Sequence, residues 1–349
     1  MTLKDIAKEA GVSVSTVSRV INNKGPHVAR PEIQKRIWDI VGRTGYMPNE
    51  NALNLKRNKK AENAKSGYSI ACLFARTPES ISDPFFSQLA RSVEAAAYKE
   101  NCHVQYSLTQ IDMMQPKTLH ALRDSNVKGI VVLGRCAPGL LHYLKRMFKY
   151  VSYTGLNSLD EKDDKYDQVI CDGKALSKTA VDYLAALGHK NIAYIGETQN
   201  EDRFTGYLDA LTANGIAFDK TNVADVQLST KNGYLGAKEL LRKALGITAI
   251  LCANDVTAIG AIGALRDMGV RVPRDISIIG IDDIDLATFM PIKLTSVHIP
   301  VEEMGSLATR VLLDRIEGGH KLHMKICLPF YIAERDSCSK PPKNPWKKA

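Results

Sequence analysis

The sequence has no apolar run that approaches the roughly 18 residues of a transmembrane helix, so no membrane span is expected. Residues Met1–Ile6 include charged side chains and no apolar core, which is not typical of a signal peptide. The seven cysteines are an odd number, lie far apart and form no Cys-x-x-Cys pair. We therefore expect reduced thiols in a cytoplasm, and neither a disulfide framework, a zinc site nor another cofactor.

Motifs that carry common enzyme chemistry are also lacking. The chain has no Gly-x-x-x-x-Gly-Lys-Ser/Thr loop, no Gly-x-Gly-x-x-Gly after an expected strand, no His-Glu-x-x-His and no Gly-x-Ser-x-Gly. Residues Ser125–Lys128 fit Ser-x-x-Lys, but that short pattern stands without its companion motifs. These absences favour a binding protein over an enzyme.

The net charge of +9 is unevenly distributed along the chain. Residues 1–67 hold thirteen basic and six acidic side chains, residues 340–349 add four lysines and no acid, and the rest of the chain sums to −2. A basic segment beside a near-neutral body is typical of a part that binds a polyanion. The alternative is a solvated basic surface without a partner.

The basic N-terminal segment has a helical pattern. Leu3, Ile6, Ala7 and Ala10 recur at the spacing of one helix face, Thr2 is a good N-cap, and Gly11 is placed to end the helix. A second helix follows, capped by Ser13, and a third is expected over residues 31–43. Two short helices joined by a glycine-containing turn and braced by a third predict a helix-turn-helix.

The second helix has a polar outward face. Its inward side chains are Val17, Val20 and Ile21, and its outward side chains are Val14, Ser15, Thr16, Ser18 and Arg19. Small polar side chains suit a helix that enters the major groove, where an arginine can bind guanine through two hydrogen bonds. A generic helical bundle is the alternative.

These residues carry a family resemblance. The runs Leu3–Ser13 and Ser15–Asn22 resemble the DNA-binding domain of the lactose-repressor/galactose-repressor (LacI/GalR) family, and residues 45–49 with Ala52 and Leu55 resemble its hinge helix. The resemblance implies a bacterial transcription regulator, a repressor, that binds a near-palindromic operator as a homodimer. It assigns DNA contacts to Thr2, Val14, Ser15, Thr16, Ser18, Arg19, Asn22, Leu55 and Lys56.

The resemblance also separates the roles of these DNA-binding residues. Val14, Ser15 and Arg19 match the positions that read bases, whereas Thr16 and Ser18 match positions that meet phosphates. Leu55 matches an apolar wedge that enters the minor groove and kinks the duplex, and Lys56 follows it.

The hinge segment departs from the family. Asn51 and Leu53 stand where members often have Val and Arg, and the polar, charged stretch 57–67 lengthens the linker. We expect looser coupling between the DNA-binding domain and the core.

The rest of the chain alternates short apolar strands with amphipathic helices. The expected strands are residues 69–74, 103–108, 129–133, 168–171, 191–196, 249–252 and 277–281. The expected helices are residues 85–100, 174–187, 203–214, 233–243, 257–268 and 301–317. This alternation predicts parallel sheets covered by helices, here in two lobes, with ligands bound beyond the carboxyl ends of the strands.

The core resembles the same family and, through it, the periplasmic sugar-binding proteins. Asp83–Phe86, Gly188–Ala193, Arg203–Tyr207 and Val272–Asp283 match its motifs. The effector-contacting positions fall on Phe85, Phe86, Arg203, Asn254 and Asp282. This set of donors, acceptors and flat rings suits a sugar or sugar derivative.

Two kinds of alternative remain for these core residues. One phenylalanine can be plain core, and Asp282 can simply cap the next helix. Leu228 stands where the family usually has an aromatic that stacks on the ligand, and Glu197 stands where a purine-binding member has a basic residue. Both differences favour a sugar over a purine.

The expected organisation follows from these segments. Residues 1–47 form the DNA-binding domain, 48–67 the hinge helix and linker, 68–338 the effector-binding and dimerisation core, and 339–349 a basic tail. Lobe 1 is expected at about 68–157 and 297–325, and lobe 2 at about 158–296 and 326–338. A transport sugar-binding protein would lack the basic N-terminal segment, and a nucleoid binder without effector control would not need the two-lobe core.

Overall fold

The computed structural model describes residues 2–21, 29–44, 68–76, 83–123, 125–136, 139–157, 166–243, 246–344 and 346. The chain divides into two compact units, Met1–Ser66 and Gly67–Ala349. None of the helices described is long and apolar enough to cross a membrane.

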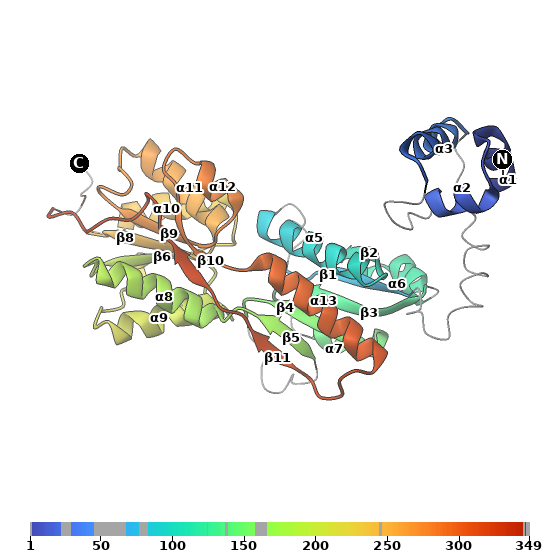
Figure 1. Cartoon of the computed structure of the whole chain (residues 1–349). Helices are drawn as coiled ribbons and strands as arrows, with labels where there is room; N and C mark the ends of the chain where they lie inside the picture. The colour runs from blue at the N-terminus through green and yellow to red at the C-terminus, as the bar shows by residue number, and fades with distance from the viewer. Residues whose placement is uncertain are drawn as a thin grey trace. The chain divides into compact units, whose positions relative to one another are not determined.

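The first unit contains three short helices, α1 (Leu3–Ala10), α2 (Val14–Ile21) and α3 (Pro31–Thr44) (Figure 1). Their apolar faces form one small core made of Ile6, Ala7, Ala10, Val17, Val20, Ile37 and Ile40. Gly11 ends α1 at a φ of 66°, a left-handed conformation that costs glycine little. The expected helix-turn-helix is therefore present, while the expected hinge helix lies outside the described residues.

The first lobe of the second unit is a parallel sheet in the order β11-β5-β4-β3-β1-β2. Its strands are β1 (Ser69–Phe74), β2 (His103–Thr109), β3 (Val127–Leu133), β4 (Tyr150–Gly155), β5 (Asp167–Ile170) and β11 (Lys325–Cys327). Helices α5 (Pro84–Lys99) and α13 (Val301–Glu317) pack together on one face. Helices α6 (Pro116–Arg123) and α7 (Leu140–Met147) bury Leu122, Leu141 and Leu144 on the other.

The second lobe repeats this plan with the order β12-β10-β9-β8-β6-β7, in which only the β10–β12 pair is antiparallel. Its strands are β6 (Ile192–Gly196), β7 (Val223–Asp225), β8 (Ala249–Cys252), β9 (Ser277–Asp282), β10 (Thr295–His298) and β12 (Tyr331–Ala333). Helices α8 (Gly173–Ala186) and α9 (Asp202–Ala213) cover one face, and α10 (Thr230–Lys243) and α11 (Asp255–Asp267) the other (Figure 1). The short helix α12 spans Asp285–Phe289.

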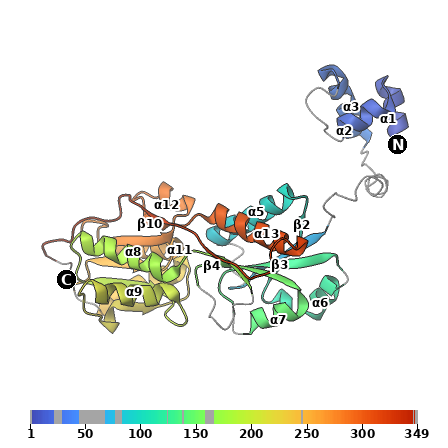
Figure 2. The ribbon, with the colours of Figure 1, turned by 60° about the horizontal axis from the view of Figure 1, so that its bottom comes forward.

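The chain crosses between the two lobes three times, after β5, after β10 and after β11 (Figure 2). One expected boundary needs correction. Residues 158–170 were assigned to lobe 2, but β5 pairs with β4 and β11 in the sheet of lobe 1. The boundary lies after residue 170, because a strand belongs to the sheet that satisfies its backbone hydrogen bonds.

Candidate functional site

Helix α2 presents the outward face that the sequence predicted. The Ser13 hydroxyl caps the helix by accepting from the Thr16 amide at 3.1 Å, and it lies 2.7 Å from the Ser15 hydroxyl. Val17 and Val20 are buried, whereas Ser15 and Arg19 are exposed and Val14 is 39% exposed. The structure therefore exposes Val14 and Ser15 in the first turn of α2 and Arg19 in its last turn.

The other expected DNA-binding residues are placed less uniformly. Thr16 and Ser18 are half-buried on α2. Thr2 forms a capping box with Asp5, whose carboxylate accepts from the Thr2 amide at 2.8 Å, and these hydrogen bonds lower the pKa of Asp5. Asn22, Leu55 and Lys56, like Asn51 and Leu53 of the hinge segment, lie outside the described residues.

The effector positions converge on a cleft between the two lobes of the second unit. Phe85 and Phe86 come from the start of α5, which follows β1. Arg203 opens α9 after β6, Asn254 follows β8, and Asp282 ends β9. All five line one cavity, because the carboxyl ends of the strands in both sheets point toward it.

The two phenylalanines form a buried wall of this cavity. Their rings meet edge to face at a centroid distance of 5.2 Å. Phe85 is 4% and Phe86 7% exposed, and both also belong to the hydrophobic core. Gly134 lies close under Phe86, since a Cβ there would sit 2.6 Å from the Phe86 ring.

Arg203 is held by the protein itself. Its Nε and Nη2 donate to the two oxygens of Glu201 at 2.7 and 3.0 Å, and its Nη1 donates to the Ala253 carbonyl at 2.7 Å. Burial opposes ionisation of Glu201, but the charge and hydrogen bonds of Arg203 outweigh it and lower the pKa of Glu201 to about 2. A carboxylate and a backbone carbonyl thus take three of the five N–H donors of this expected ligand contact.

Asn254 and Asp282 have different environments. Asn254 caps α11, because its side chain accepts from the Thr257 amide at 3.1 Å. Asp282 does not cap α12, whose N-cap is Ile284. Burial raises the pKa of Asp282, and the charges of Asp255 and Asp83 raise it further, which favours the protonated form. Its φ of 123° is a strained backbone conformation for a side chain other than glycine.

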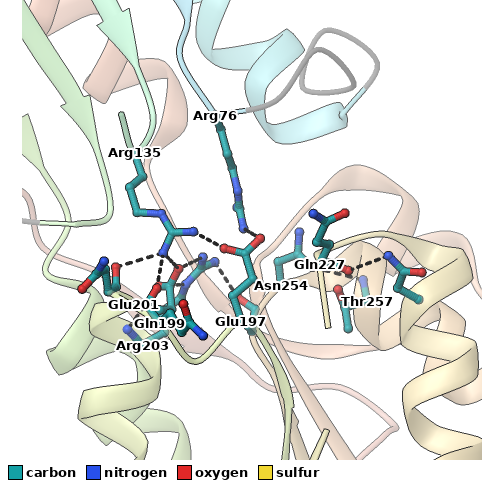
Figure 3. A network of polar contacts seen from close by, with 12 residues as sticks. Arg76, Arg135, Glu197, Gln199, Glu201, Arg203, Gln227, Asn254 and Thr257 are labelled. Atoms are coloured by element: carbon teal, nitrogen blue, oxygen red, sulfur yellow. Dashed lines mark hydrogen bonds and ion pairs between the residues drawn. The ribbon is translucent and has the colours of Figure 1, made fainter. Parts of the chain in front are cut away.

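A set of charged residues that the sequence did not single out as ligand contacts joins the two lobes at this cleft. Arg76 and Arg135 of lobe 1 both contact the carboxylate of Glu197 in lobe 2, and Arg135 also lies 3.5 Å from Glu201 (Figure 3). Both arginines come two residues after a buried strand, β1 or β3. That position, directly beyond a strand's carboxyl end, is the signal that could have identified them.

The cavity between these groups is small. It leaves about 20 Å³ in which the centre of a water molecule can lie, room for about one water. A sugar ring therefore fits only when the lobes move apart. Chemically, the walls offer arginine donors, an amide, carboxyl groups and aromatic faces, which is the set that orients a polyhydroxylated ligand.

Comparison with known proteins places both units. Residues 2–49 match the family model "Bacterial regulatory proteins, lacI family", and residues 181–338 match "Periplasmic binding protein-like domain". The HTH-type transcriptional regulator DegA of Bacillus subtilis (strain 168) is 32% identical over 344 residues, covering 97% of this chain and 98% of that protein. Catabolite control protein A of Priestia megaterium is 31% identical, covering 89% of this chain and 91% of that protein.

Solved structures share the fold over almost the whole chain. The cellobiose complex of the transcriptional regulator CelR has a TM-score of 0.71 at 25% identity, covering 97% of this chain and 99% of that one. The Lac repressor dimer bound to operator and the anti-inducer ONPF has a TM-score of 0.70 at 22% identity, with the same coverage, and its likeness concerns the fold. The helix-turn-helix, the two-lobe core and the full-length relatives agree: the chain belongs to the lacI family of bacterial regulatory proteins and is a DNA-binding transcription regulator.

Proposed function

We propose that this regulator is a repressor whose operator affinity is controlled by a sugar or sugar derivative bound between the lobes. The observation that carries the proposal is the convergence of Arg203, Asn254 and Asp282 with two aromatic rings on one inter-lobe cavity. Further support comes from relatives of similar fold that were solved with cellobiose or ribose. We propose no catalytic activity and a cytoplasmic location in a bacterial cell.

The proposed switch is separation and closure of the lobes. A ligand shifts a two-state protein only through contacts that differ between the states. Contacts between Glu197 of lobe 2 and Arg76 and Arg135 of lobe 1 exist only while the lobes are close, and a ligand that enters must exchange with them. Both an inducer and a corepressor are compatible with this exchange.

The proposed DNA-binding part is residues 1–47, joined through a hinge and linker at 48–67 to a core at 68–338 that binds effector and dimerises. In this proposal Val14, Ser15 and Arg19 read bases, and Thr16 and Ser18 meet phosphates. Thr2 and Asn22 also contact the DNA. Leu55 acts as a minor-groove wedge with Lys56 beside it. A homodimer then binds a near-palindromic operator with half-sites about one helical turn apart.

The DNA-binding role is tested with Arg19→Ala in the full chain. We expect a loss of about 1–3 kcal/mol on the operator and a relaxed base preference, because a bidentate contact to guanine is removed. Lys56→Ala should weaken operator and random DNA evenly and flatten the salt dependence. Fluorescence anisotropy with both DNAs measures this, with Arg271→Ala in the core as a control, and equal losses for Arg19→Ala on both DNAs would contradict base reading.

The effector site is tested with Asp282→Asn, which keeps the size of the side chain. We expect operator affinity within a few-fold of the wild type but a tenfold or greater loss of the sugar response, since the carboxyl group and its proton are removed from the cavity wall. Sugars are first screened by thermal shift, and anisotropy is then measured with and without the best one. Asp275→Asn, at an ion pair with the exposed Arg271 and away from the cavity, is the matched control. An unchanged response in Asp282→Asn would place the site elsewhere.

A further inference from the structure

Two arginines stand side by side on the wall that lobe 1 contributes to the cleft. β1 and β3 are paired in parallel with Phe74 opposite Leu133. Arg76 and Arg135 each follow two residues beyond these partners, so they extend the same register past the carboxyl edge of the sheet. Two neighbouring guanidinium groups repel each other unless an anion lies between them.

In the structure that anion is the carboxylate of Glu197 from lobe 2. Arg76 Nη2 lies 2.9 Å from Glu197 Oε1, and Arg135 pairs with Oε2 (Figure 3). Arg135 Nη1 also donates to the carbonyls of Gln199 and Asn200, each at 2.9 Å, which fixes its orientation. The two oxygens of the Glu197 carboxylate thus each pair with one arginine. Arginines recognise carboxylate and phosphate ligands through contacts of this kind.

Glu197 does not satisfy all the hydrogen-bond donors of the two arginines. Arg76 Nη2 is buried, and despite its short distance to Glu197 it makes no hydrogen bond of acceptable geometry with the described residues. Leaving a buried donor without a hydrogen bond costs free energy. An oxygen placed differently from those of Glu197 would satisfy this nitrogen.

The two walls of the cleft carry opposite charges, with Arg76 and Arg135 on lobe 1 and Glu197 on lobe 2. Arg203 is neutralised within lobe 2 by Glu201, so its charge is not available to Glu197. Lobe 1 contributes Arg76, Arg135 and the carboxyl group of Asp83, for which burial raises the pKa. When the lobes separate, Glu197 leaves with lobe 2, and the wall of lobe 1 keeps a positive charge.

We propose that the effector carries an anionic group, a carboxylate or a phosphate on the sugar, which takes the place of Glu197 between Arg76 and Arg135. This proposal rests on the proposed function and specifies the chemical class of its ligand. A carboxylate conserves the charge between the two arginines, because one monoanion replaces another, and a phosphate ester adds further negative charge there. A neutral sugar would instead leave two adjacent guanidinium groups facing each other in a nearly dry site, which is costly.

The first experiment compares matched ligands by isothermal titration calorimetry on the full-length protein. The pairs are D-glucuronate with D-glucose, D-galacturonate with D-galactose, and ribose 5-phosphate with ribose. We expect at least one acid or phosphate ester to bind ten or more times tighter than its neutral partner. The uronates and the phosphate ester distinguish a carboxylate from a phosphate ligand.

The second experiment removes each partner of the anion site. In Arg76→Gln and in Arg135→Gln the affinity ratio between acid and neutral sugar should fall to near one. Glu197→Gln should bind inorganic phosphate at least tenfold tighter than the wild type, since the internal competitor is gone. Arg271→Gln, which changes an exposed arginine of lobe 2, should retain the wild-type ratio.

The outcomes separate this proposal from the one it rests on. Equal or tighter binding of the neutral sugars, or a preference for acids that survives both arginine variants, overturns the anion site. If a neutral sugar then also changes operator affinity, the proposed function stands without it. If an acid binds through Arg76 and Arg135 but operator affinity is unchanged, the anion site stands and the regulatory role of the cleft fails. If no compound binds and Glu197→Gln gains no phosphate affinity, both are contradicted.

Discussion

Glu201 and Arg203 form a buried ion pair at the cleft. Glu201 is 3% exposed, and its pKa of about 2 lies below the ordinary 4.5 because Arg203 outweighs the burial. A carboxylate whose pKa is lower in the folded than in the unfolded protein stabilises the fold above pH 4.5. That contribution is lost as the pH falls from about 4.5 to about 2.

We therefore predict that Glu201→Gln destabilises the protein by roughly 3 kcal/mol at pH 7, and that its deficit relative to the wild type shrinks between pH 4.5 and 2. Urea unfolding followed by circular dichroism across this range measures the difference. Asp275→Asn, at a half-buried carboxylate that pairs with the exposed Arg271, is the control and should show a much smaller deficit at pH 7. A Glu201→Gln deficit independent of pH would contradict the assigned ionisation.

For single residues, the sequence predicted which side chains line the cavity better than it predicted which side chains pair with each other. Arg203, Asn254 and Asp282 were assigned to the cleft because they match family motifs and follow strands, and all three line one cavity. The pairing of Arg203 with Glu201 was not predicted, since it depends on side-chain directions in the turn before α9. The approach of Arg76 and Arg135 to Glu197 depends on how closely the two lobes meet, which no local pattern contains.

Among the elements, purely apolar strands and long amphipathic helices were predictable. β1, β8 and α13 have the bounds that the pattern predicted. β4 and β10 were not predicted, because buried polar residues interrupt their apolar character. Ser152 and Thr154 in β4, and Thr295 and Ser296 in β10, are fully buried. The Ser296 hydroxyl donates to Asp255 at 2.6 Å. This hydrogen bond offsets the cost of burying a polar residue in a strand, and the local sequence pattern does not contain it.

The packing of α10 against α11 gives a prediction about two glycines in one helix. A Cβ on Gly260 would lie 1.9 Å from the Thr230 carbonyl oxygen, whereas a Cβ on Gly263 would meet nothing nearer than the Tyr234 ring at 3.7 Å. We expect Gly260→Ala to destabilise the protein by about 1–3 kcal/mol, since the helices must move apart. Gly263→Ala should instead gain up to about 1 kcal/mol of helix propensity.

Thermal unfolding of both variants beside the wild type measures the contrast. Because the substitutions are chemically identical and three residues apart, helix propensity favours both equally, and any difference comes from the contact between the helices. Equal midpoints for the two variants would mean that α10 and α11 do not approach as closely as the structure indicates.

At the scale of the whole molecule, the C-terminal segment has a structural role on lobe 2. The Ser337 hydroxyl accepts from the Thr295 amide at 2.8 Å and donates to the Ile278 carbonyl at 2.6 Å. The Ser339 carbonyl accepts a hydrogen bond from His189 Nε2 at 2.9 Å, and Trp346 packs on the core. The described part of the segment forms no helix after α13, and it has no heptad of leucines of the kind that joins chains in a coiled coil.

We expect the core to make the dimer contacts, and one face of it is apolar. In α12, Leu286 is 52% and Phe289 82% exposed, which is unusual for large apolar side chains in adjacent turns. Asp285 at the start of α12 also lines a surface hollow with residues of α5 and α13, so parts of both lobes contribute to this face. A face that combines apolar and charged groups suits a two-fold interface in which the same patch meets itself.

We predict that the full chain is a dimer through this face and does not form a tetramer. Phe289→Asp should shift the protein toward monomer at micromolar concentration, because the two-fold axis places a buried charge on each side of the interface. It should also weaken operator binding, since two DNA-binding domains held on one dimer engage two half-sites together. Sedimentation equilibrium measures the masses, and Phe218→Asp, at another exposed phenylalanine, is the control that should remain dimeric. A stable tetramer of the wild type, or a Phe289→Asp variant that dimerises as tightly as the control, would contradict an interface built on α12.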